Sequence, residues 1–328
     1  MEKLRIAVIG TGHLGNIHTR LWKTQPNVIL SGIYDIDSNV AMRSSQENEC
    51  KSFATLDEAL TESDAVVIAV PTSEHYALAE KCIDCNIHFF IEKPITAIYK
   101  EAKELIKKAR QKNLIVQVGH VERFNPALNS LKNYNLNPLF IETHRLSQFK
   151  PRATDVSVVL DLMIHDIDIM LWLIKSKIKK IDANGVAVLT DTFDIANARI
   201  TFENGAVANL TSSRISAHPM RKTRIFQKDA YISIDFGLQD VEVYRLIDGK
   251  YNPEEHTREA TMLGTIEAGT RNRTILFEKP EVIGLNAIAE EQKTFIEAIA
   301  NGSPVAVSAE EAAEALRIAE LIVEKMKR

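Results

Sequence analysis

The feature that most constrains this chain is a glycine-rich turn placed directly after an apolar run near its start. Residues 4–10, LRIAVIG, are apolar almost throughout, which is typical of a strand buried on both faces of a sheet. The turn GTGHLG follows, with Gly10, Gly12 and Gly15 at the spacing that joins a strand to a helix in a βαβ unit. A chain that begins in this way is expected to build a parallel sheet covered by helices.

Strands and helices are expected to alternate through the first 120 residues, as in a doubly wound parallel sheet of the Rossmann type. The expected strands are 4–10, 28–35, a short one near Phe53, 64–70, 88–92 and 114–119. The expected helices are 14–23, 38–48, a short one from Leu56, 73–86 and 96–113. The fold class is therefore α/β in this part of the chain.

The glycine turn predicts a dinucleotide site. Gly10 permits a tight turn, Gly12 lets the backbone approach a pyrophosphate, and Gly15 allows close packing of helix on strand. The helix that is expected to start at about Leu14, directly after His13, offers free N–H groups and its positive dipole end to the phosphates. The acid at the end of the second strand is placed to accept hydrogen bonds from ribose hydroxyls and to repel a 2′-phosphate. That acid is Asp35, and it favours NAD over NADP.

Other unusual residues follow the carboxyl ends of later strands, where ligands bind in such a sheet. They are Pro71 and His75 after 64–70, Glu92, Lys93 and Pro94 after 88–92, and His120 after 114–119. A lysine beside a nicotinamide can hydrogen-bond an alcohol or ketone oxygen and favour its alkoxide-like character during hydride transfer. Lys93 is therefore a candidate catalytic residue. The peptide bond before Pro94 is open to either isomer.

A very apolar helix is expected at 157–174, and it carries a narrow polar stripe. At about 100° per residue, Asp161, His165, Asp168 and Trp172 share one side of the segment DLMIHDIDIM and its extension. Charged residues are seldom fully buried without a partner or a task. The stripe is either a satisfied buried His–Asp pair or part of an active site.

These motifs together resemble the Gfo/Idh/MocA family of oxidoreductases over most of the chain. The resemblance is carried by GTGHLG, VPTSEH, EKP, VGHVERFNPA, the later Asp-x-x-x-His, and the closing FIEAIANGSPVAVSAEEAAEALRIAELI. It implies an NAD(P)-dependent oxidoreductase of sugars, polyols or their derivatives. It also implies an α+β second domain with an open mixed sheet that often mediates homodimers or homotetramers.

The resemblance also assigns roles to particular residues. It implies that the helix at 157–174 faces Lys93, with Asp161 and His165 as the catalytic or substrate-binding pair. Histidine, with an unperturbed pKa near ~6.5, suits the removal of a hydroxyl proton, and Asp161 is suited to orient the imidazole or hold a substrate hydroxyl. Asp168 is expected to be structural. In relatives, residues matching His120, Glu122, Arg123 and Asn125 face cofactor or substrate.

The second domain is expected to run over 121–328, after a first domain of 1–120, with the C-terminal helices able to pack back on the first domain. Its expected strands are 139–149, 180–189, 195–202 and 206–213, and more strands are expected within 223–236 and 241–249. Asn204 and Gly205 lie between two alternating runs, which is a strong hairpin signal. Residues 252–284 show no clear period and are expected to contain a long loop, followed by helices at 285–300 and 308–327.

Two features bear on the substrate. Arg145, Lys150 and Arg152 form a basic group before the helix, which is either a solvated face or an anion clamp for a diphosphate. Within the family, VGHVERFNPA and TDVSVVLDLMIHDID look most like enzymes that oxidise the 3-hydroxyl of UDP-N-acetylglucosamine-type sugars. Met163 departs from the glycine that many relatives have between the Asp and the His.

Two other functions are kept open. One is a dehydrogenase of the same family that acts on a free polyol, inositol or dihydrodiol. The other is a dinucleotide-binding regulator without turnover, although Lys93, Asp161 and His165 are all present.

Composition excludes several other classes. A formal net charge of −4 gives no footprint for nucleic acid or an anionic membrane, and no apolar run reaches the ~20 residues of a membrane span. The start enters a strand without a signal-peptide pattern, so a cytoplasmic location is expected. The 3 cysteines imply no disulfide framework. The pair Cys82 and Cys85 has no second pair beside it, so no metal site is expected.

Overall fold

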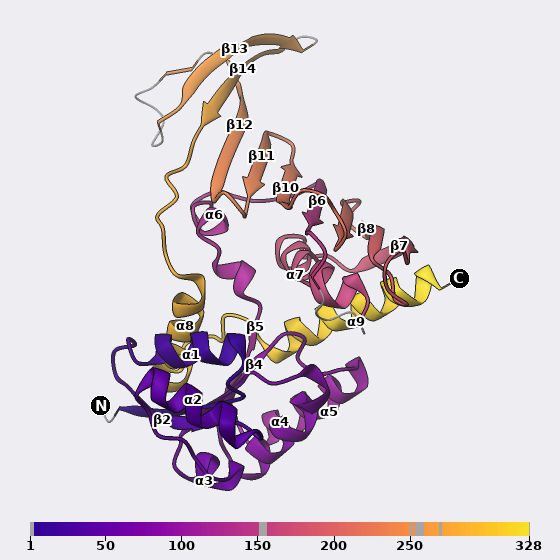
Figure 1. Cartoon of the computed structure of the whole chain (residues 1–328). Helices are drawn as coiled ribbons and strands as arrows, with labels where there is room; N and C mark the ends of the chain where they lie inside the picture. Colours follow the sequence, from indigo (N-terminus) through magenta and orange to yellow (C-terminus); the bar gives the residue numbers. More distant parts are fainter. Residues whose placement is uncertain (1–2, 151–155, 250, 253–258, 269–270, 328) are drawn as a thin grey trace. The chain divides into compact units, whose positions relative to one another are not determined.

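The computed structural model describes residues 3–150, 156–249, 251–252, 259–268 and 271–327. The chain divides into two compact units (Figure 1). The first comprises Met1–Phe124 and Asn286–Arg317, and the second comprises Asn125–Leu285 and Ile318–Arg328. The first unit is therefore built from two separate stretches of sequence, of which the later one enters from the C-terminal part of the chain.

The first unit contains a parallel sheet, as the sequence predicts. Within the described residues its 5 strands lie in the order β2-β1-β3-β4-β5. These strands are β1 (Leu4–Ile9), β2 (Val28–Tyr34), β3 (Ala65–Ile68), β4 (His88–Glu92) and β5 (Val116–Gly119). All four pairings are parallel, so the carboxyl ends of the strands meet at one edge.

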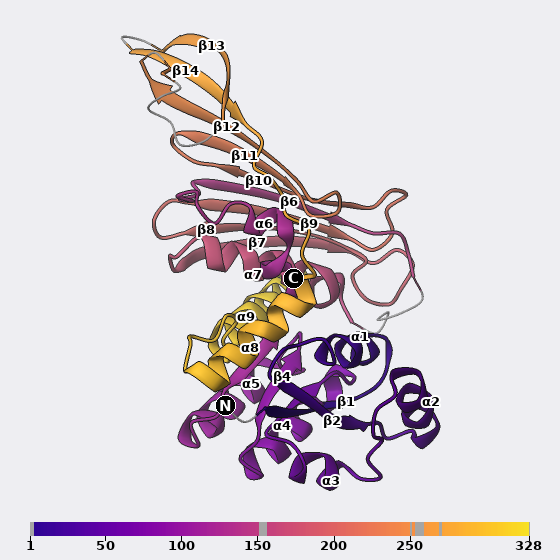
Figure 2. The ribbon, with the colours of Figure 1, turned by 90° about the vertical axis from the view of Figure 1, so that its left-hand side faces the viewer.

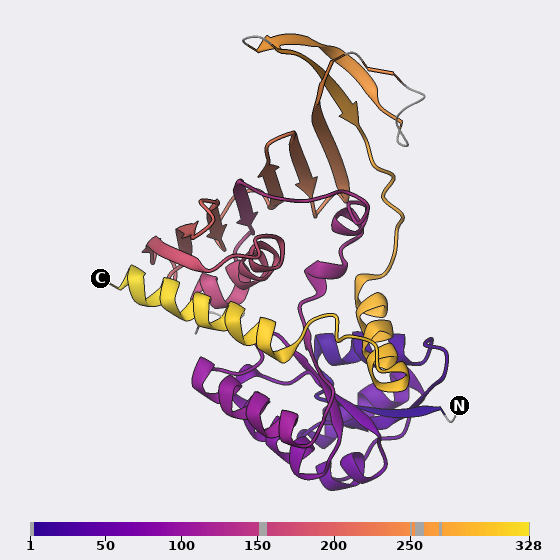
Figure 3. The ribbon, with the colours of Figure 1, turned by 180° about the vertical axis from the view of Figure 1, so that it is seen from behind.

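Helices cover both faces of this sheet, which explains the apolar character of its strands. The helices are α1 (His13–Trp22), α2 (Ser38–Asn48), α3 (Leu56–Thr61), α4 (His75–Asp84), α5 (Tyr99–Gln111) and α8 (Ala287–Asn301). The last helix, α9 (Ala309–Met326), has residues in both units. On one face Ile6 and Val8 pack with Trp22 of α1 and Phe295 of α8, and α8 lies beside α1 (Figure 3). Intervening residues such as Ala7 are equally buried, as the pleat of a strand covered on both sides requires.

The expected short strand near Phe53 is wrong. Ser52 forms a single isolated bridge with Ile33, and the chain turns into α3 immediately afterwards. Thr55 caps that helix by accepting a hydrogen bond from the Glu58 N–H at 3.2 Å. The segment between the bridge and the cap is too short for a ladder to propagate.

The second unit contains a long mixed sheet, which confirms the expected α+β character of this part. Its 9 strands, among the described residues, lie in the order β13-β14-β12-β11-β10-β6-β9-β8-β7 (Figure 2). They are β6 (Phe140–Leu146), β7 (Ile178–Val186), β8 (Ile195–Phe202), β9 (Val207–Ser213), β10 (Met220–Phe226), β11 (Ala230–Asp235), β12 (Asp240–Asp248), β13 (Thr261–Ala268) and β14 (Arg271–Glu278). β6 and β9 run parallel, while the other neighbours are antiparallel.

The hairpin predicted at Asn204-Gly205 is confirmed. β8 and β9 pair in antiparallel register, and Gly205 has a φ of 87°, which suits glycine in a tight turn. The inward side chains of β8 are fully buried, with Ala196 and Ile200 at 0% exposure. The period-2 pattern in the sequence therefore identifies the face that packs inward.

The long loop expected within 252–284 is wrong, because β13 and β14 lie there. The inward side of β14 carries Thr274 and Glu278 beside Leu276, so the apolar alternation typical of a strand is broken. Both polar groups have partners. Thr274 donates to the Gly249 carbonyl at 2.6 Å, and Glu278 accepts from the Tyr134 hydroxyl at 2.8 Å. A strand whose buried face is polar but satisfied gives no hydrophobic period to detect.

Within the described part of the chain, no helix combines the length and apolarity needed to cross a membrane.

Candidate active site

The glycine turn has the geometry that a pyrophosphate cradle needs. Gly10 has a φ of 88°, and a Cβ there would lie 2.6 Å from the Ala69 carbonyl oxygen. A Cβ on Gly15 would lie 1.9 Å from the Gly10 carbonyl oxygen, so α1 sits as close to the turn as backbone allows. A Cβ on Gly12 would meet nothing within 4 Å. The outer glycines are thus required by the fold itself, while the middle one leaves open space for a ligand.

The amino end of α1 faces that space without a side-chain cap. Gly12 is the N-cap residue and supplies no side-chain hydrogen bond, and His13 and Leu14 are exposed. Free N–H groups and the positive dipole end of a ten-residue helix attract anions. The turn and helix start therefore fit the phosphates of NAD, and the predicted contacts of His13 and Leu14 with the cofactor stay predictions.

Asp35 is fixed beside the glycine turn by a residue that the sequence reading did not single out. Its Oδ2 accepts hydrogen bonds from the Thr11 backbone N–H at 2.8 Å and from the Thr11 hydroxyl at 3.0 Å. Its Oδ1 accepts from the Asp37 N–H at 3.0 Å. A carboxylate can accept about four hydrogen bonds, so this one retains capacity for a ribose hydroxyl. Thr11 thereby links the glycine turn to Asp35, whose predicted contact with a ribose stays a prediction.

The EKP corner lies at the end of β4, where Lys93 and Pro94 are joined by a cis peptide bond. Glu92 is the last residue of β4, and its Oε1 lies 2.8 Å from His18 Nε2. The Lys93 side chain is half-buried. The corner therefore stands at the carboxyl edge of the sheet, where the sequence predicts it.

His75 lies beneath this corner, with both ring nitrogens near backbone carbonyls. Nδ1 is 2.9 Å from the Pro94 oxygen and Nε2 is 3.1 Å from the Val70 oxygen. Burial lowers the pKa of His75, although the two carbonyls favour the protonated ring. Because its ring contacts both carbonyls, the buried side chain of His75, 1% exposed, connects the loop after β3 to the EKP corner. The predicted contacts of His75 and of Pro71, which is exposed, with the cofactor stay predictions.

The segment after β5 is mostly buried. It contains η2 (Val121–Phe124) and α6 (Pro126–Asn129). Arg123 is 9% exposed, and its Nη1 lies 3.2 Å from Glu311 Oε1 of α9. The Asn125 side chain caps α6 by accepting from the Ala127 N–H at 3.1 Å. His120 and Glu122 are buried as well. Arg123 thus connects η2 to α9, and Asn125 caps the start of α6. The predicted contacts of both residues with ligands stay predictions.

The polar stripe lies on a helix that begins irregularly. η3 (Val159–Met163) is a π-helical turn, and α7 (Ile164–Leu173) continues from it. The regular α-helix expected from 157 is therefore wrong in its first turn, and Asp161 lies in the π-helical part. Such turns are rare and often occur at functional sites. Asp161 and His165 are half-buried, whereas Asp168 is 1% exposed, in line with a structural role.

Met163 is fully buried, at 0% exposure. Its bulk is therefore accommodated inside the second unit. The surrounding residues therefore leave room for a methionine side chain at this position, where the family resemblance favours glycine.

The structure corrects the interpretation of Arg145, Lys150 and Arg152 as one basic group before this helix. Arg145 is not on a solvated face or an exposed clamp, because its Nε and Nη2 contact the Asp166 carboxylate at 2.9 and 3.0 Å in a buried bidentate pair. A charged side chain on the inward face of β6 is buried only with such a partner. Lys150 is exposed, and Arg152 lies outside the described residues.

A buried acid that the sequence reading missed anchors the entry to the helix. Asp194 Oδ2 accepts from the backbone N–H groups of Val188, Leu189 and Thr190 at 2.7–3.0 Å. Burial opposes its ionisation, but these three donors and the Thr190 hydroxyl lower the pKa of Asp194 to about 2.

Arg214 connects this acid to the start of the helix. Its Nε lies 3.6 Å from Asp194 Oδ1, and its Nη2 donates to the Val156 carbonyl at 2.5 Å. Thr192 donates to the same carbonyl at 3.1 Å, and the Val158 N–H donates to the Phe193 carbonyl at 2.9 Å. The backbone just before Asp161 is thus tied to the β7–β8 connection at several points.

Replacing Asp194 by asparagine is expected to lower the free energy of unfolding by on the order of 2 kcal/mol at pH 7. A carboxyl whose pKa is lower in the folded state stabilises the fold above its ordinary pKa, and this contribution is lost as pH falls through the folded value. The difference between the two proteins should therefore shrink between about pH 5 and pH 2. Urea denaturation across this range measures it. Asp191→Asn, an exposed acid in the same connection, is the matched control and should change nothing.

The described residues contain no cluster of three or more histidine, cysteine or acidic side chains able to hold a metal ion. Cys82 and Cys85 are free thiols, and burial raises the pKa of Cys82 well above its ordinary value.

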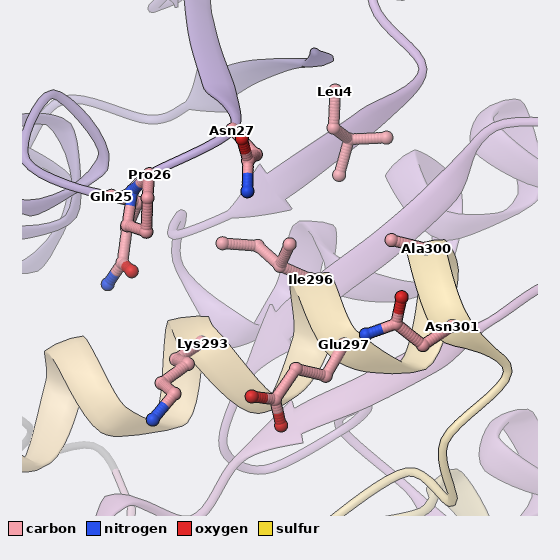
Figure 4. Close-up of a pocket in the computed structure, with 9 residues that line it drawn as sticks. All are labelled: Leu4, Gln25, Pro26, Asn27, Lys293, Ile296, Glu297, Ala300 and Asn301. Atoms are coloured by element: carbon pink, nitrogen blue, oxygen red, sulfur yellow. The ribbon is translucent and has the colours of Figure 1, made fainter. Parts of the chain in front are cut away.

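A pocket of about 540 Å³ lies elsewhere in the first unit (Figure 4). It is lined by Leu4, Gln25, Pro26, Asn27, Lys293, Ile296, Glu297, Ala300 and Asn301. Leu4 begins β1 and Asn27 directly precedes β2, so the pocket is at the amino edge of the sheet. It is thus at the opposite edge from the glycine turn and is not the dinucleotide site.

The glycine turn, Asp35 and Lys93 follow strands of one parallel sheet at its carboxyl edge, which is the arrangement expected of a dinucleotide-dependent oxidoreductase. The chain belongs to the Gfo/Idh/MocA family. Residues 4–120 match the model described as an oxidoreductase family with an NAD-binding Rossmann fold, and residues 130–233 match the C-terminal domain of the same family. The chain is therefore an NAD-binding member of a family of dehydrogenases.

Among its relatives is a UDP-N-acetylglucosamine 3-dehydrogenase of Acidithiobacillus ferrooxidans, 37% identical over 93% of this chain and 91% of that protein. A solved structure of the enzyme of that name, GnnA from the same organism, has a TM-score of 0.88 and covers 100% of this chain and 99% of its own. A myo-inositol 2-dehydrogenase of Thermotoga maritima is 24% identical over 95% of this chain and 93% of its own length.

Proposed function

We propose that this protein oxidises the 3-hydroxyl of a UDP-N-acetylhexosamine with NAD. The observation that carries the proposal is the 37% identity to a UDP-N-acetylglucosamine 3-dehydrogenase, which extends over nearly the full length of both chains. The geometry supports the cofactor half of the reaction through the open space at Gly12 and the fixed carboxylate of Asp35.

In this proposal three side chains act on the reacting hydroxyl. His165 takes the hydroxyl proton on a ring nitrogen, Asp161 orients the imidazole or holds a neighbouring hydroxyl, and the Lys93 ammonium stabilises the negative charge that develops on the oxygen. When bound, NAD supplies the acceptor for the hydride that leaves the carbon bearing this hydroxyl. The protein's own contribution is therefore proton removal, charge stabilisation and orientation. His120, Arg123 and Arg152 remain proposed substrate contacts.

The test is an assay of the purified protein with NAD and a panel of alcohols, following the absorbance of NADH. Turnover is expected with UDP-N-acetylglucosamine or a related UDP-N-acetylhexosamine. Free N-acetylglucosamine, which lacks the nucleotide, serves as the matched control and should react poorly. Turnover of myo-inositol without turnover of any UDP-sugar would replace this substrate by a free polyol. Tight NAD binding without turnover of any alcohol would instead favour a non-catalytic regulator.

Asp35→Ala is expected to weaken NADH binding by about tenfold and to remove discrimination against NADPH, since a charged acceptor for the ribose hydroxyls is lost. Fluorescence titrations with both reduced cofactors measure the change. Asp37→Ala is the control, because Asp37 is exposed, caps α2 and contributes only its backbone N–H to Asp35. A preference for NADH that survives in Asp35→Ala would show that another residue reads the ribose.

We further propose that the protein is a cytoplasmic homodimer or homotetramer. The three cysteines are free thiols, as expected in a reducing compartment. Aromatic side chains form a continuous row across five strands on the outer face of the large sheet, and Phe226 within it is 39% exposed. The row consists of Phe140, Phe226, Tyr231, Tyr244 and Phe277. Sedimentation at the mass of a 36.8 kDa monomer at assay concentrations would contradict the oligomer.

A further inference from the structure

Gln25, Gln292 and His18 form a row of hydrogen-bonded side chains that ends at Glu92 of the EKP corner in the first unit. Gln25 Nε2 lies 3.4 Å from Gln292 Oε1, Gln292 Nε2 lies 3.1 Å from His18 Nδ1, and His18 Nε2 lies 2.8 Å from Glu92 Oε1. His18 and Gln292 are both 0% exposed. Polar groups this deeply buried need defined partners, so their donor and acceptor roles can be assigned.

Two backbone carbonyls fix the direction of the row. Gln25 Nε2 donates to the Ala289 carbonyl at 2.8 Å, which leaves a second hydrogen of that nitrogen for Gln292 Oε1. Gln292 Nε2 donates to the His18 carbonyl at 3.2 Å and, with its second hydrogen, to His18 Nδ1. Reversing either amide would place two oxygens against each other. His18 therefore accepts at Nδ1 and carries its proton at Nε2, which donates to Glu92.

Glu92 is confined from the other side by a glycine. β4 and β5 pair with Glu92 opposite Gly119. A Cβ on Gly119 would lie 2.8 Å from Glu92 Oε2, so the carboxylate lies directly over the glycine backbone. One oxygen is held by His18, and the other fills the space that a side chain at 119 would take.

We propose that His18 is a positioning residue for Lys93, acting through Glu92. Lys93 follows Glu92, the last residue of β4, and the carbonyl oxygen of the next residue, Pro94, lies 2.9 Å from His75 Nδ1. Lys93 thus lies between two residues that each contact a buried imidazole, since His18 contacts Glu92 and His75 contacts Pro94. This inference rests on the proposed role of Lys93 in hydride transfer, and it assigns to α1 and α8 a part in aiming the lysine.

His18→Leu is expected to lower kcat by about 10²-fold, since a misplacement of about 1 Å in a reacting group has that effect. The dissociation constant of NADH should change by less than about threefold, because the phosphate and ribose contacts lie elsewhere. His18→Gln, which offers an amide N–H at the reach of Nε2, should restore most of the lost turnover. Trp22→Phe, a buried change one turn further along the same helix, controls for lost packing and should lower the melting temperature while keeping kcat.

Gly119→Ala provides a second route to the same carboxylate. It should reproduce the loss of kcat, and the double variant with His18→Leu should lose little more than either single variant, because both displace one group. Fully additive losses would overturn the proposal. Wild-type kcat in His18→Leu, or a loss that His18→Gln does not restore, would do the same.

The tautomer gives a readout that needs no substrate. Long-range ¹H–¹⁵N correlation spectra of the histidine-labelled wild-type protein should contain one imidazole protonated at Nε2 that is absent in His18→Leu. A ring protonated at Nδ1 at this position would overturn the proposal. A protein that fails to oxidise UDP-sugars but shows this tautomer, and loses kcat on whichever alcohol it does oxidise, would contradict the substrate and leave the role of His18 standing.

Discussion

His165→Asn is expected to lower turnover by about 10²–10⁴-fold, the range for loss of a general base, while NADH still binds. Asparagine keeps a polar side chain on α7 but cannot take up the hydroxyl proton at neutral pH. Steady-state kinetics with saturating NAD, together with a fluorescence titration of NADH, measure both effects. His218→Asn makes the same chemical change at an exposed position of the same unit and should leave kcat unaltered.

Lys93→Ala tests the other half of the same chemistry. Removal of a cation that stabilises developing negative charge costs about 10²–10³-fold in turnover. Lys100→Ala, at an exposed position of α5, is the matched control. Wild-type turnover in either His165→Asn or Lys93→Ala would remove that residue from the proposed mechanism.

The second large effect is expected at the glycine turn, where two similar substitutions should fail in different ways. Gly15→Ala should destabilise the protein by about 3 kcal/mol or more even without NAD, because the new Cβ would lie 1.9 Å from a backbone oxygen that cannot move away. Gly12→Ala should leave the melting temperature of the cofactor-free protein nearly unchanged, since nothing lies within 4 Å of the new Cβ.

In the presence of NADH, the Gly12→Ala substitution is also expected to have a large effect. Gly12→Ala should bind NADH weakly, because its methyl group occupies the space through which a pyrophosphate approaches. Thermal unfolding with and without NADH separates the two effects, since a bound ligand raises the melting temperature only where it binds. A stable Gly15→Ala protein, or a Gly12→Ala protein with normal NADH affinity, would contradict this reading of the turn.

Local sequence patterns were sufficient for the parts of the fold that depend on neighbouring residues. The glycine spacing predicts the turn between β1 and α1, and the alternation in 195–202 predicts which face of β8 is buried. Both signals are local, because each residue's environment is set by its position along one strand or one turn. The helix carrying Asp161 and His165 is predicted in the same way, apart from its π-helical start.

The rest depends on partners that are distant in sequence. His18 lies 74 residues from Glu92 and 274 from Gln292, so nothing near it distinguishes it from a helix-surface histidine. Arg145 resembles a member of a basic cluster until Asp166 is found against it. A buried polar group is identified by its partner, and the partner is known only once the chain has folded.

The second stretch of the first unit, residues 286–317, affects the order in which the two units can fold during synthesis. Phe295 of α8 fills the core beneath β1, and Gln292 supports His18, yet both are synthesised after nearly all of the second unit. Domains generally fold as they emerge during translation, but here the cofactor-binding core lacks part of its packing until residue 317 has left the ribosome. A fragment ending at residue 124 would expose the apolar surface that α8 covers. The first unit, whose chain begins first, is therefore completed only after residues 125–285 of the second unit have been synthesised.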